Sequence, residues 1–266
     1  MSQPSLIDTH CHLFMPPLAR DIAGVCERAR QAGVTDIIVP TTDLDSWSAV
    51  RDLVNHDGVH PAFGLHPRST GKVMIDGAPD PTRLVELKER LATQLRECRA
   101  VAIGEVGMDD RAEEAPLRAQ HAVLHAQLEL AMDFDLPVIL HCRNGWELLV
   151  SALQPYAGRI RGLMHDYTRH PGLMTPFLKI GFHIGFGGAI TRPHKKLSRL
   201  SAEELPLDRI VLETAAPQSG LETVAPEEME PRHVGEVAAE LAKIRGMSLE
   251  EVADATTANA RRFFGI

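Results

Sequence analysis

The sequence has few cysteines, no long hydrophobic run and no glycine-rich nucleotide-binding motif. Its four cysteines are Cys11, Cys26, Cys98 and Cys142. They are too scattered for a zinc knuckle and too few for a disulfide scaffold, so we expect reduced thiols. No apolar stretch approaches the length of a membrane span, and no basic segment followed by an apolar one opens the chain. Secretion and membrane insertion are therefore unsupported, and we expect a cytoplasmic protein.

The net charge leaves the class of substrate open. With 28 Lys and Arg residues against 36 Asp and Glu residues, it is -8. This sign argues against a broad nucleic-acid-binding surface, although a local basic loop or a metal ion can still attract phosphate. An acidic chain suits a small-molecule substrate at least as well as DNA.

Short apolar segments alternate with amphipathic ones along the whole chain. We expect eight strands, at residues 6–12, 35–40, 60–65, 100–105, 137–141, 162–165, 183–187 and 209–213. We expect helices at residues 18–32, 43–55, 83–95, 116–132, 146–153, 171–180, 231–245 and 248–262. Strands this short and apolar are typical of a parallel sheet that is buried on both faces.

Eight strands over 266 residues, with no linker between them, favour an α/β fold in which a single (β/α)8 TIM barrel occupies residues 1–266 as one domain. An open doubly wound sheet is the alternative. No Gly-x-Gly-x-x-Gly follows a strand to favour it. In a TIM barrel the active site lies at the C-terminal ends of the strands, so that is where we expect the chemistry.

The first predicted strand ends in two histidines separated by one residue. Alternation along a strand places Asp8, His10 and His12 on one face, and Thr9 and Cys11 on the other. Borderline divalent metals favour imidazole ligands, and the Asp8 carboxylate could coordinate a metal or orient an imidazole. The alternative is a surface strand that carries histidines by chance. Only partners elsewhere in the chain decide between the two.

Further donors stand at the ends of other predicted strands. His66 follows the third strand, Glu105 ends the fourth, His141 the fifth, His165 the sixth and Glu213 the eighth. Each has a structural explanation when taken singly, but together they predict a ring of nitrogen and oxygen donors around a metal site. Seven other histidines lack this placement and are interpreted as packing or surface residues: His56, His60, His121, His125, His170, His183 and His233.

Seven segments also carry a resemblance to a known family. They are residues 8–12 (Asp-Thr-His-Cys-His), 64–67 (Gly-Leu-His-Pro), 104–109 (Gly-Glu-Val-Gly-Met-Asp), 127–131 (Gln-Leu-Glu-Leu-Ala), 136–143 (Leu-Pro-Val-Ile-Leu-His-Cys-Arg), 213–217 (Glu-Thr-Ala-Ala-Pro) and 259–265 (Asn-Ala-Arg-Arg-Phe-Phe-Gly). These segments resemble the signatures of the TatD-type metal-dependent deoxyribonucleases, which belong to the amidohydrolase superfamily. The resemblance covers essentially the whole chain.

The resemblance implies a TIM barrel that carries one to three divalent metal ions, Mg²⁺, Mn²⁺ or Zn²⁺, and that hydrolyses phosphodiester bonds of DNA. It implies the metal ligands His10, His12, Glu105, His141 and His165. It implies catalytic positions at Glu105, Glu213 and Ala215. Candidate substrate contacts are His66, Arg143, Arg192 and Lys195. The last two belong to the basic loop 191–196, and the alternative interpretation of this loop is a solvated helix start. The sequence indicates no membrane association and no obligate protein partner.

Ala215 breaks the family pattern. The family has Glu-Thr-Asp-x-Pro where this chain has alanine in the third place. The resemblance implies that this aspartate ligates the metal and takes a proton from the attacking water, and alanine can do neither. Loss of a general base forfeits a factor on the order of 10² to 10⁴, or roughly 3 to 5 kcal/mol of barrier. We therefore expect weak activity.

Three origins of Ala215 are open: an engineered substitution, a naturally degenerate site, or a rearranged site in which Asp166 or Glu213 takes over. Phe14, Gly145 and residues 165–169 also depart from the family pattern, and this scatter favours natural divergence. Two other functions stay open as well. Barrels with this metal arrangement also hydrolyse amides, lactones and other small esters, and a catalytically silent metal-binding barrel could bind a ligand or partner at the same place.

Overall fold

The computed structural model describes residues 4–266, which form two compact units. Unit 1 consists of residues 4–39, Leu53–His60 and His165–Ile266, and unit 2 of Pro40–Asp52 and Pro61–Met164. The strands are β1 (Leu6–Asp8), β2 (Val34–Pro40), β3 (Val59–Phe63), β4 (Met74–Ile75), β5 (Ala78–Pro79), β6 (Ala102–Asp109), β7 (Val138–Arg143), β8 (Gly162–Met164), β9 (His183–Phe186) and β10 (Ile210–Leu212). The α-helices are α1 (Ile22–Gln31), α2 (Ser46–Leu53), α3 (Pro81–Glu97), α4 (Leu117–Asp133), α5 (Trp146–Leu153), α6 (Thr175–Lys179), α7 (Lys196–Glu204), α8 (Val234–Arg245) and α9 (Leu249–Phe264).

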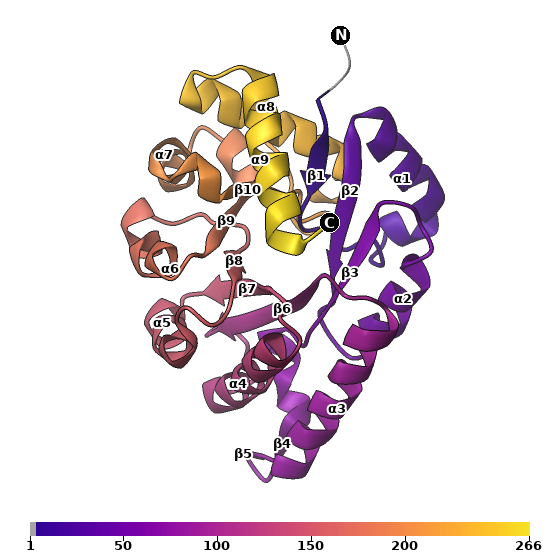
Figure 1. The fold of residues 1–266 in the computed structure, drawn as a ribbon, viewed down its shortest axis with the longest axis vertical. Coiled ribbons are helices and arrows are strands. Elements are labelled where there is room, and N and C mark those ends of the chain that lie inside the picture. Colours follow the sequence, from indigo (N-terminus) through magenta and orange to yellow (C-terminus); the bar gives the residue numbers. More distant parts are fainter. Residues whose placement is uncertain (1–3) are drawn as a thin grey trace. The chain divides into compact units, whose positions relative to one another are not determined.

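Unit 1 contains a parallel sheet with the strand order β9-β10-β1-β2. β1 pairs with β2, and β9 pairs with β10. The ends of β1 and β10 are joined by main-chain hydrogen bonds from Thr9 N–H to the Leu212 carbonyl (3.0 Å) and from His12 N–H to the Ala216 carbonyl (2.8 Å). Helices α8 and α9 pack against β1 and β10 (Figure 1). The segments that follow β1 and β10 therefore lie side by side.

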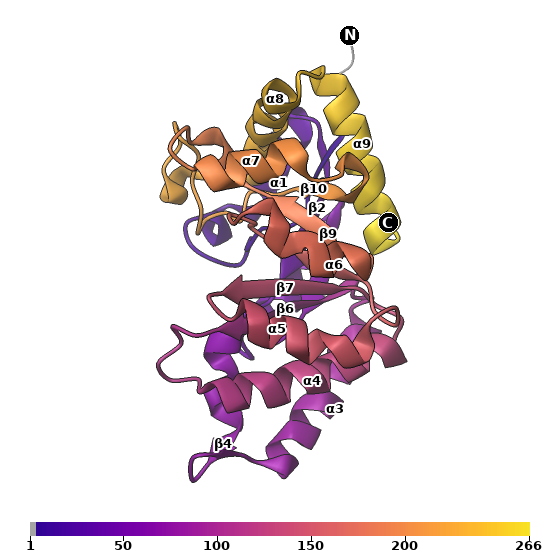
Figure 2. The same ribbon diagram turned by 90° about the vertical axis from the view of Figure 1, so that its left-hand side faces the viewer.

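Unit 2 contains the other parallel strands, in the order β3-β6-β7-β8. All eight residues of β6 are buried, as expected for a strand covered on both faces. Helix α4 packs against β6 and α3 (Figure 2). Its buried Gln120 side chain accepts a hydrogen bond from the Asp109 N–H group (2.8 Å) and donates one to the Asp109 carbonyl (2.7 Å). The Gln127 side chain likewise accepts a hydrogen bond from the Leu65 N–H group and donates one to the Leu65 carbonyl. Helix α4 thus fixes the main chain beside two of the candidate site segments.

Two predicted strand ends were wrong by four residues each, and the others differ by no more than two residues. The first strand was expected to reach residue 12, but β1 ends at Asp8, whose carboxylate accepts the His10 N–H group (3.3 Å) and bends the chain in an Asx turn. The fourth strand was expected to end at Glu105, but β6 continues to Asp109. It is longer because Met108 and Asp109 still pair with residues of β7. Glu105 consequently lies within its strand.

Helical boundaries also differed where a side chain caps a helix. The helix expected at residues 18–32 is divided into a 3-10 turn, Leu18–Arg20, and α1, because the Asp21 carboxylate accepts the Gly24 N–H group at the start of α1. The basic loop 191–196 is short, since α7 begins at Lys196. The small antiparallel hairpin of β4 and β5 was not predicted.

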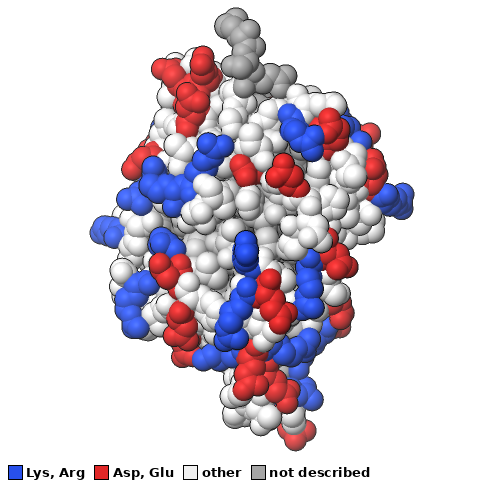
Figure 3. Space-filling model, turned by 45° about the vertical axis from the view of Figure 1, so that its right-hand side comes forward, with Lys and Arg blue, Asp and Glu red and all other residues white. Residues whose placement is uncertain are grey.

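Other expectations concern the surface and the thiols. No helix within residues 4–266 is long and apolar enough to cross a membrane. None of the four cysteines, all of which lie in the described part, forms a disulfide. On the face shown in Figure 3, Lys and Arg side chains are interspersed with Asp and Glu side chains. The single domain expected over residues 1–266 stays a prediction.

Candidate metal centre

The predicted donors form two clusters, one in each unit. The unit 1 cluster consists of His10, His12, His165 and Glu213, and the unit 2 cluster consists of His66, Glu105 and His141. Five of these residues follow the C-terminal ends of strands, and the other two, Glu105 and His141, lie within β6 and β7.

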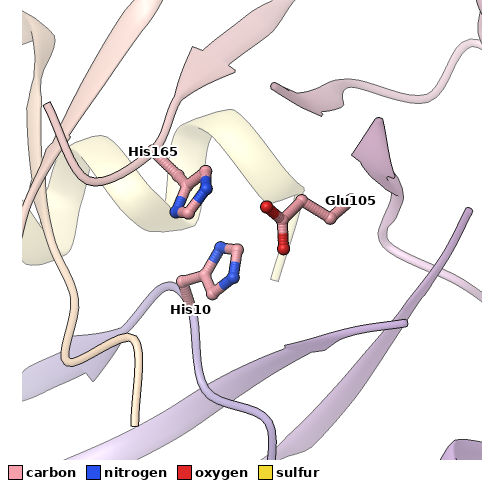
Figure 4. Close-up of side chains that lie close together, drawn as sticks. All are labelled: His10, Glu105 and His165. Atoms are coloured by element: carbon pink, nitrogen blue, oxygen red, sulfur yellow. The ribbon is translucent and has the colours of Figure 1, made fainter. Parts of the chain in front are cut away.

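Three imidazoles of the unit 1 cluster are in contact. The Nε2 atoms of His10 and His12 are 3.3 Å apart, and both residues are buried. The rings of His10 and His165 are stacked, with centroids 4.1 Å apart (Figure 4). Two nitrogens that bind one zinc ion at about 2.0–2.1 Å are about 2.9–3.4 Å apart, for bond angles between a right angle and the tetrahedral angle. The separation of His10 and His12 therefore fits chelation of one divalent ion.

Glu213 adds a carboxylate to this cluster. Its Oε1 atom accepts the Asp166 N–H group (2.6 Å) and lies 3.5 Å from His165 Nδ1. Its Oε2 atom is buried and has no hydrogen-bond partner among residues 4–266. Gly185 makes room for it, because a Cβ atom there would lie 2.3 Å from Oε2. A buried carboxylate oxygen without a partner is unfavourable unless a cation or a proton reaches it, so these residues fit a metal ion.

Asp8 forms hydrogen bonds with the main chain next to the histidines and Glu213. Its carboxylate accepts hydrogen bonds from the N–H (2.9 Å) and the hydroxyl (2.6 Å) of Thr214, in addition to the His10 N–H group. Burial raises the pKa of Asp8 to about 7, because it outweighs the hydrogen bonds from Thr214. These contacts fix the backbones that carry His10 and Glu213. The expectation that Asp8 could coordinate a metal or orient an imidazole stays a prediction.

Ala215 lies beside His10, because its N–H group donates to the His10 carbonyl (2.8 Å). Its side chain is buried, and its φ of 51° places it in the left-handed region. Asp and Asn adopt this conformation several times more often than most other residues. The backbone at position 215 therefore suits the aspartate that the family pattern has there, although the chain presents only a methyl group.

The unit 2 cluster is built around one carboxylate. Glu105 Oε1 lies 2.8 Å from His141 Nδ1 and 3.3 Å from His66 Nε2. The rings of the two histidines are in edge contact, with centroids 4.4 Å apart. One ligand atom from each of the three residues lies within 4.8 Å of the others, which is close enough to surround a single ion.

The tautomer of His66 limits its role in this cluster. The Arg68 N–H group donates to His66 Nδ1 (3.1 Å). Because a main-chain N–H can only donate, a neutral His66 carries its proton on Nε2, which faces Glu105. A protonated Nε2 cannot also bind a metal. His66 therefore acts as a hydrogen-bond donor in this arrangement, and its predicted substrate contact stays a prediction.

Asp109 is a site residue that the sequence analysis missed. It is buried at the end of β6, where Oδ2 lies 3.4 Å from His141 Nε2 and 2.7 Å from Arg68 Nε. Burial alone would raise the pKa of Asp109, but hydrogen bonds from His141 and Arg68 outweigh it and hold the pKa well below its usual range. The ionised carboxylate orients the His141 ring so that Nδ1 faces Glu105. The spacing offered a signal, since residues four apart in a strand share a face.

The predicted cationic substrate contacts lie on exposed or half-buried positions. Arg143 is exposed at the end of β7, and Lys195 is exposed just before α7. Arg192 donates from Nη2 to the Gly220 carbonyl (2.8 Å), so part of its guanidinium group holds a neighbouring loop. Substrate binding by these three residues stays a prediction.

Comparison with known proteins identifies the family of this chain. A family model described as TatD related DNase matches residues 7–265. The chain belongs to the TatD family of metal-dependent hydrolases. YjjV of Escherichia coli K12, named an uncharacterized metal-dependent hydrolase, is 33% identical over 261 residues, which are 98% of both chains. The crystal structure of this TatD homologue matches with a TM-score of 0.87 over 98% of each chain.

Some TatD-family relatives have names that refer to nucleic acids. Human deoxyribonuclease TATDN3 is 29% identical over 272 residues, covering 97% of this chain and 94% of the relative. The 3'-5' ssDNA/RNA exonuclease TatD of Klebsiella pneumoniae is 30% identical over 268 residues, covering 98% of each chain. The structural match to the TatD homologue confirms the predicted fold class, an α/β TIM barrel of eight parallel strands with flanking helices.

Proposed function

We propose that this TatD-family hydrolase cleaves phosphodiester bonds of DNA with one to three divalent metal ions, and that alanine at position 215 slows the reaction. The unit 1 cluster carries the proposal. It pairs the Nε2 atoms of His10 and His12 at 3.3 Å beside the His165 ring, and it buries an oxygen of Glu213 that has no partner among residues 4–266. The names of the nuclease relatives support DNA as the substrate.

The metal ligands in this proposal are His10, His12 and His165 in unit 1, and Glu105 and His141 in unit 2. When bound, a divalent ion polarises a phosphoryl oxygen and lowers the pKa of water. Imidazole and carboxylate donors together accept several divalent metals, so availability decides which one is held.

The chain's own groups orient these ligands and bind the substrate. Asp109 holds the His141 ring, and Glu213 lies beside His165 while it accepts the Asp166 N–H group. His66 offers its Nε2 proton to a phosphate oxygen. Ala215 has no group that can take a proton from the attacking water. We therefore expect a rate reduced by a factor on the order of 10² to 10⁴.

DNA binding in this proposal depends on a few local contacts. The interspersed charges in Figure 3 and the net charge of -8 do not favour a broad basic surface. Arg143, Arg192 and Lys195 are the proposed phosphate contacts. Because only a few cations would contact phosphate, the affinity for DNA should fall only modestly as salt is raised.

Substitution of Ala215 tests the proposal. Hydrolysis of single-stranded and duplex DNA is measured in Mg²⁺, Mn²⁺ or Zn²⁺ for the wild type, Ala215→Asp and Ala215→Asn. We expect slow cleavage by the wild type, and a rate about 10²-fold or more higher for Ala215→Asp. Ala215→Asn is the matched control, because it has the same shape and the same tolerance of the left-handed backbone but no base. It should leave the rate at the wild-type level.

Other outcomes would contradict the proposal. Equal rates for Ala215→Asp and Ala215→Asn would show that position 215 does not supply the missing base. Turnover of lactones or amides without DNA cleavage by any of the three proteins would favour a small-molecule hydrolase. Failure of every substrate with metal bound to all three proteins would favour the catalytically silent barrel.

A further inference from the structure

A pair of histidines on α4 takes no part in the clusters described above. His121 and His125 are one helical turn apart, and their Nε2 atoms approach to 3.1 Å. Their rings are 4.3 Å apart between centroids and tilted by 54°. His121 is exposed and His125 half-buried, so water and ions reach the pair. The sequence analysis interpreted both residues as packing or surface histidines.

The geometry of the pair fits one metal ion. Two nitrogens bound to one zinc ion at about 2.0–2.1 Å are about 2.9–3.4 Å apart. The observed 3.1 Å lies within this interval. Residues four apart on a helix face each other, so both imidazoles can direct their Nε2 lone pairs to one point without a change of backbone.

A buried hydroxyl orients one of the two rings. Tyr156 is 7% exposed, and its Oη atom lies 2.7 Å from His125 Nδ1. If Nδ1 donates its proton to Oη, Nε2 is left as the unprotonated atom that a metal requires. Glu129 lies one turn after His125 in α4 and places a negative charge near the pair. Its carboxylate forms an ion pair with Lys88.

We propose that His121 and His125 form a surface site for one borderline divalent transition-metal ion, such as Zn²⁺ or Cu²⁺, with Tyr156 orienting His125 and water completing the coordination. Imidazole donors select these ions over Mg²⁺, which prefers oxygen. The site is independent of the proposed hydrolase activity. A bound ion would link two turns of α4, the helix whose Gln120 and Gln127 amides fix the main chain of Asp109 and Leu65.

Zinc stoichiometry at equilibrium tests the proposal. The wild type, His121→Gln, His125→Gln and the double variant are dialysed against excess Zn²⁺, and zinc per chain is counted by mass spectrometry. We expect each single variant to bind one zinc ion fewer than the wild type, and the double variant to bind the same number as either single variant. Circular dichroism checks that the variants are folded.

The matched control is His194→Gln, which removes an exposed histidine outside the pair and should keep the wild-type zinc count. An unchanged count in either single variant would overturn the proposal. So would an additive loss in the double variant, because it would mean that each histidine binds zinc separately. The clusters at the strand ends contribute equally to all of these proteins, so the comparison does not depend on whether they bind metal.

Discussion

Acid should destabilise this protein through His183, a histidine outside the candidate metal centre. His183 begins β9 and is 7% exposed, and its ring packs against Phe263 with centroids 4.9 Å apart. Neither ring nitrogen has a hydrogen-bond partner among residues 4–266. Burial and the charges of Arg209 and Arg262 lower its pKa from 6.5 to about 4. The folded chain therefore resists protonation of this ring, whereas the unfolded chain does not.

The sign and size of the effect follow from linkage. Below pH 6.5, His183 becomes protonated in the unfolded state but stays neutral in the folded state. The stability contributed by neutral His183 is therefore lost as the pH falls toward 4. The pKa of about 4 corresponds to a total loss of about 3 kcal/mol in the free energy of unfolding. About 2 kcal/mol of this should be gone by pH 5.

Urea unfolding at pH 7 and pH 5, with chelator present, measures this loss. We compare the wild type with His183→Phe, whose ring can occupy the same apolar contact with Phe263. The free energy of unfolding should fall by about 2 kcal/mol more in the wild type than in the variant between the two pH values. Replacement of an exposed histidine, His170→Gln, should leave the wild-type difference intact. Equal pH dependence in the wild type and His183→Phe would refute the reasoning.

Two further predictions concern the candidate metal centre and its scaffold. Gly107→Ala should lower the free energy of unfolding by about 3 kcal/mol or more, because φ is 140° and a Cβ atom would lie 2.0 Å from the His141 carbonyl oxygen. Gly235→Ala in α8, where Cβ meets only Leu6 at 3.7 Å, should not destabilise, and similar urea midpoints for the two variants would contradict this account. Asp109→Asn should weaken Mn²⁺ or Zn²⁺ binding about 10- to 100-fold, measured by calorimetry, because the His141 ring loses its carboxylate partner. Wild-type affinity in Asp109→Asn would show that Asp109 does not position the ring.

Periodicity in the sequence predicted the order and type of most elements. Helix α5, at Trp146–Leu153, has the predicted bounds, and the strand-helix alternation is that of the TatD homologue. Periodicity could not show that Asp21 caps α1, because a cap depends on which main-chain N–H group the side chain reaches. It also could not show that β6 extends to Asp109, since that extension depends on pairing with β7, which is distant in sequence.

The donors of both clusters could be selected from the sequence, because parallel strands place their C-terminal ends at one edge of a sheet. The sequence analysis described them as one ring, and their role as metal ligands stays a prediction. The supporting contacts were not predictable. Thr214 holds Asp8 across more than two hundred residues of sequence, and Arg68 reaches Asp109 from a different segment. The tautomer of His66 likewise depends on a main-chain N–H group that only the folded structure places.

Anomalous scattering from crystals grown with Mn²⁺ or Zn²⁺ tests the central claim most directly. The account predicts a metal peak at about 2.0–2.2 Å from the Nε2 atoms of both His10 and His12. Crystals that contain the metal elsewhere, but show no peak bonded to these two nitrogens, would contradict it.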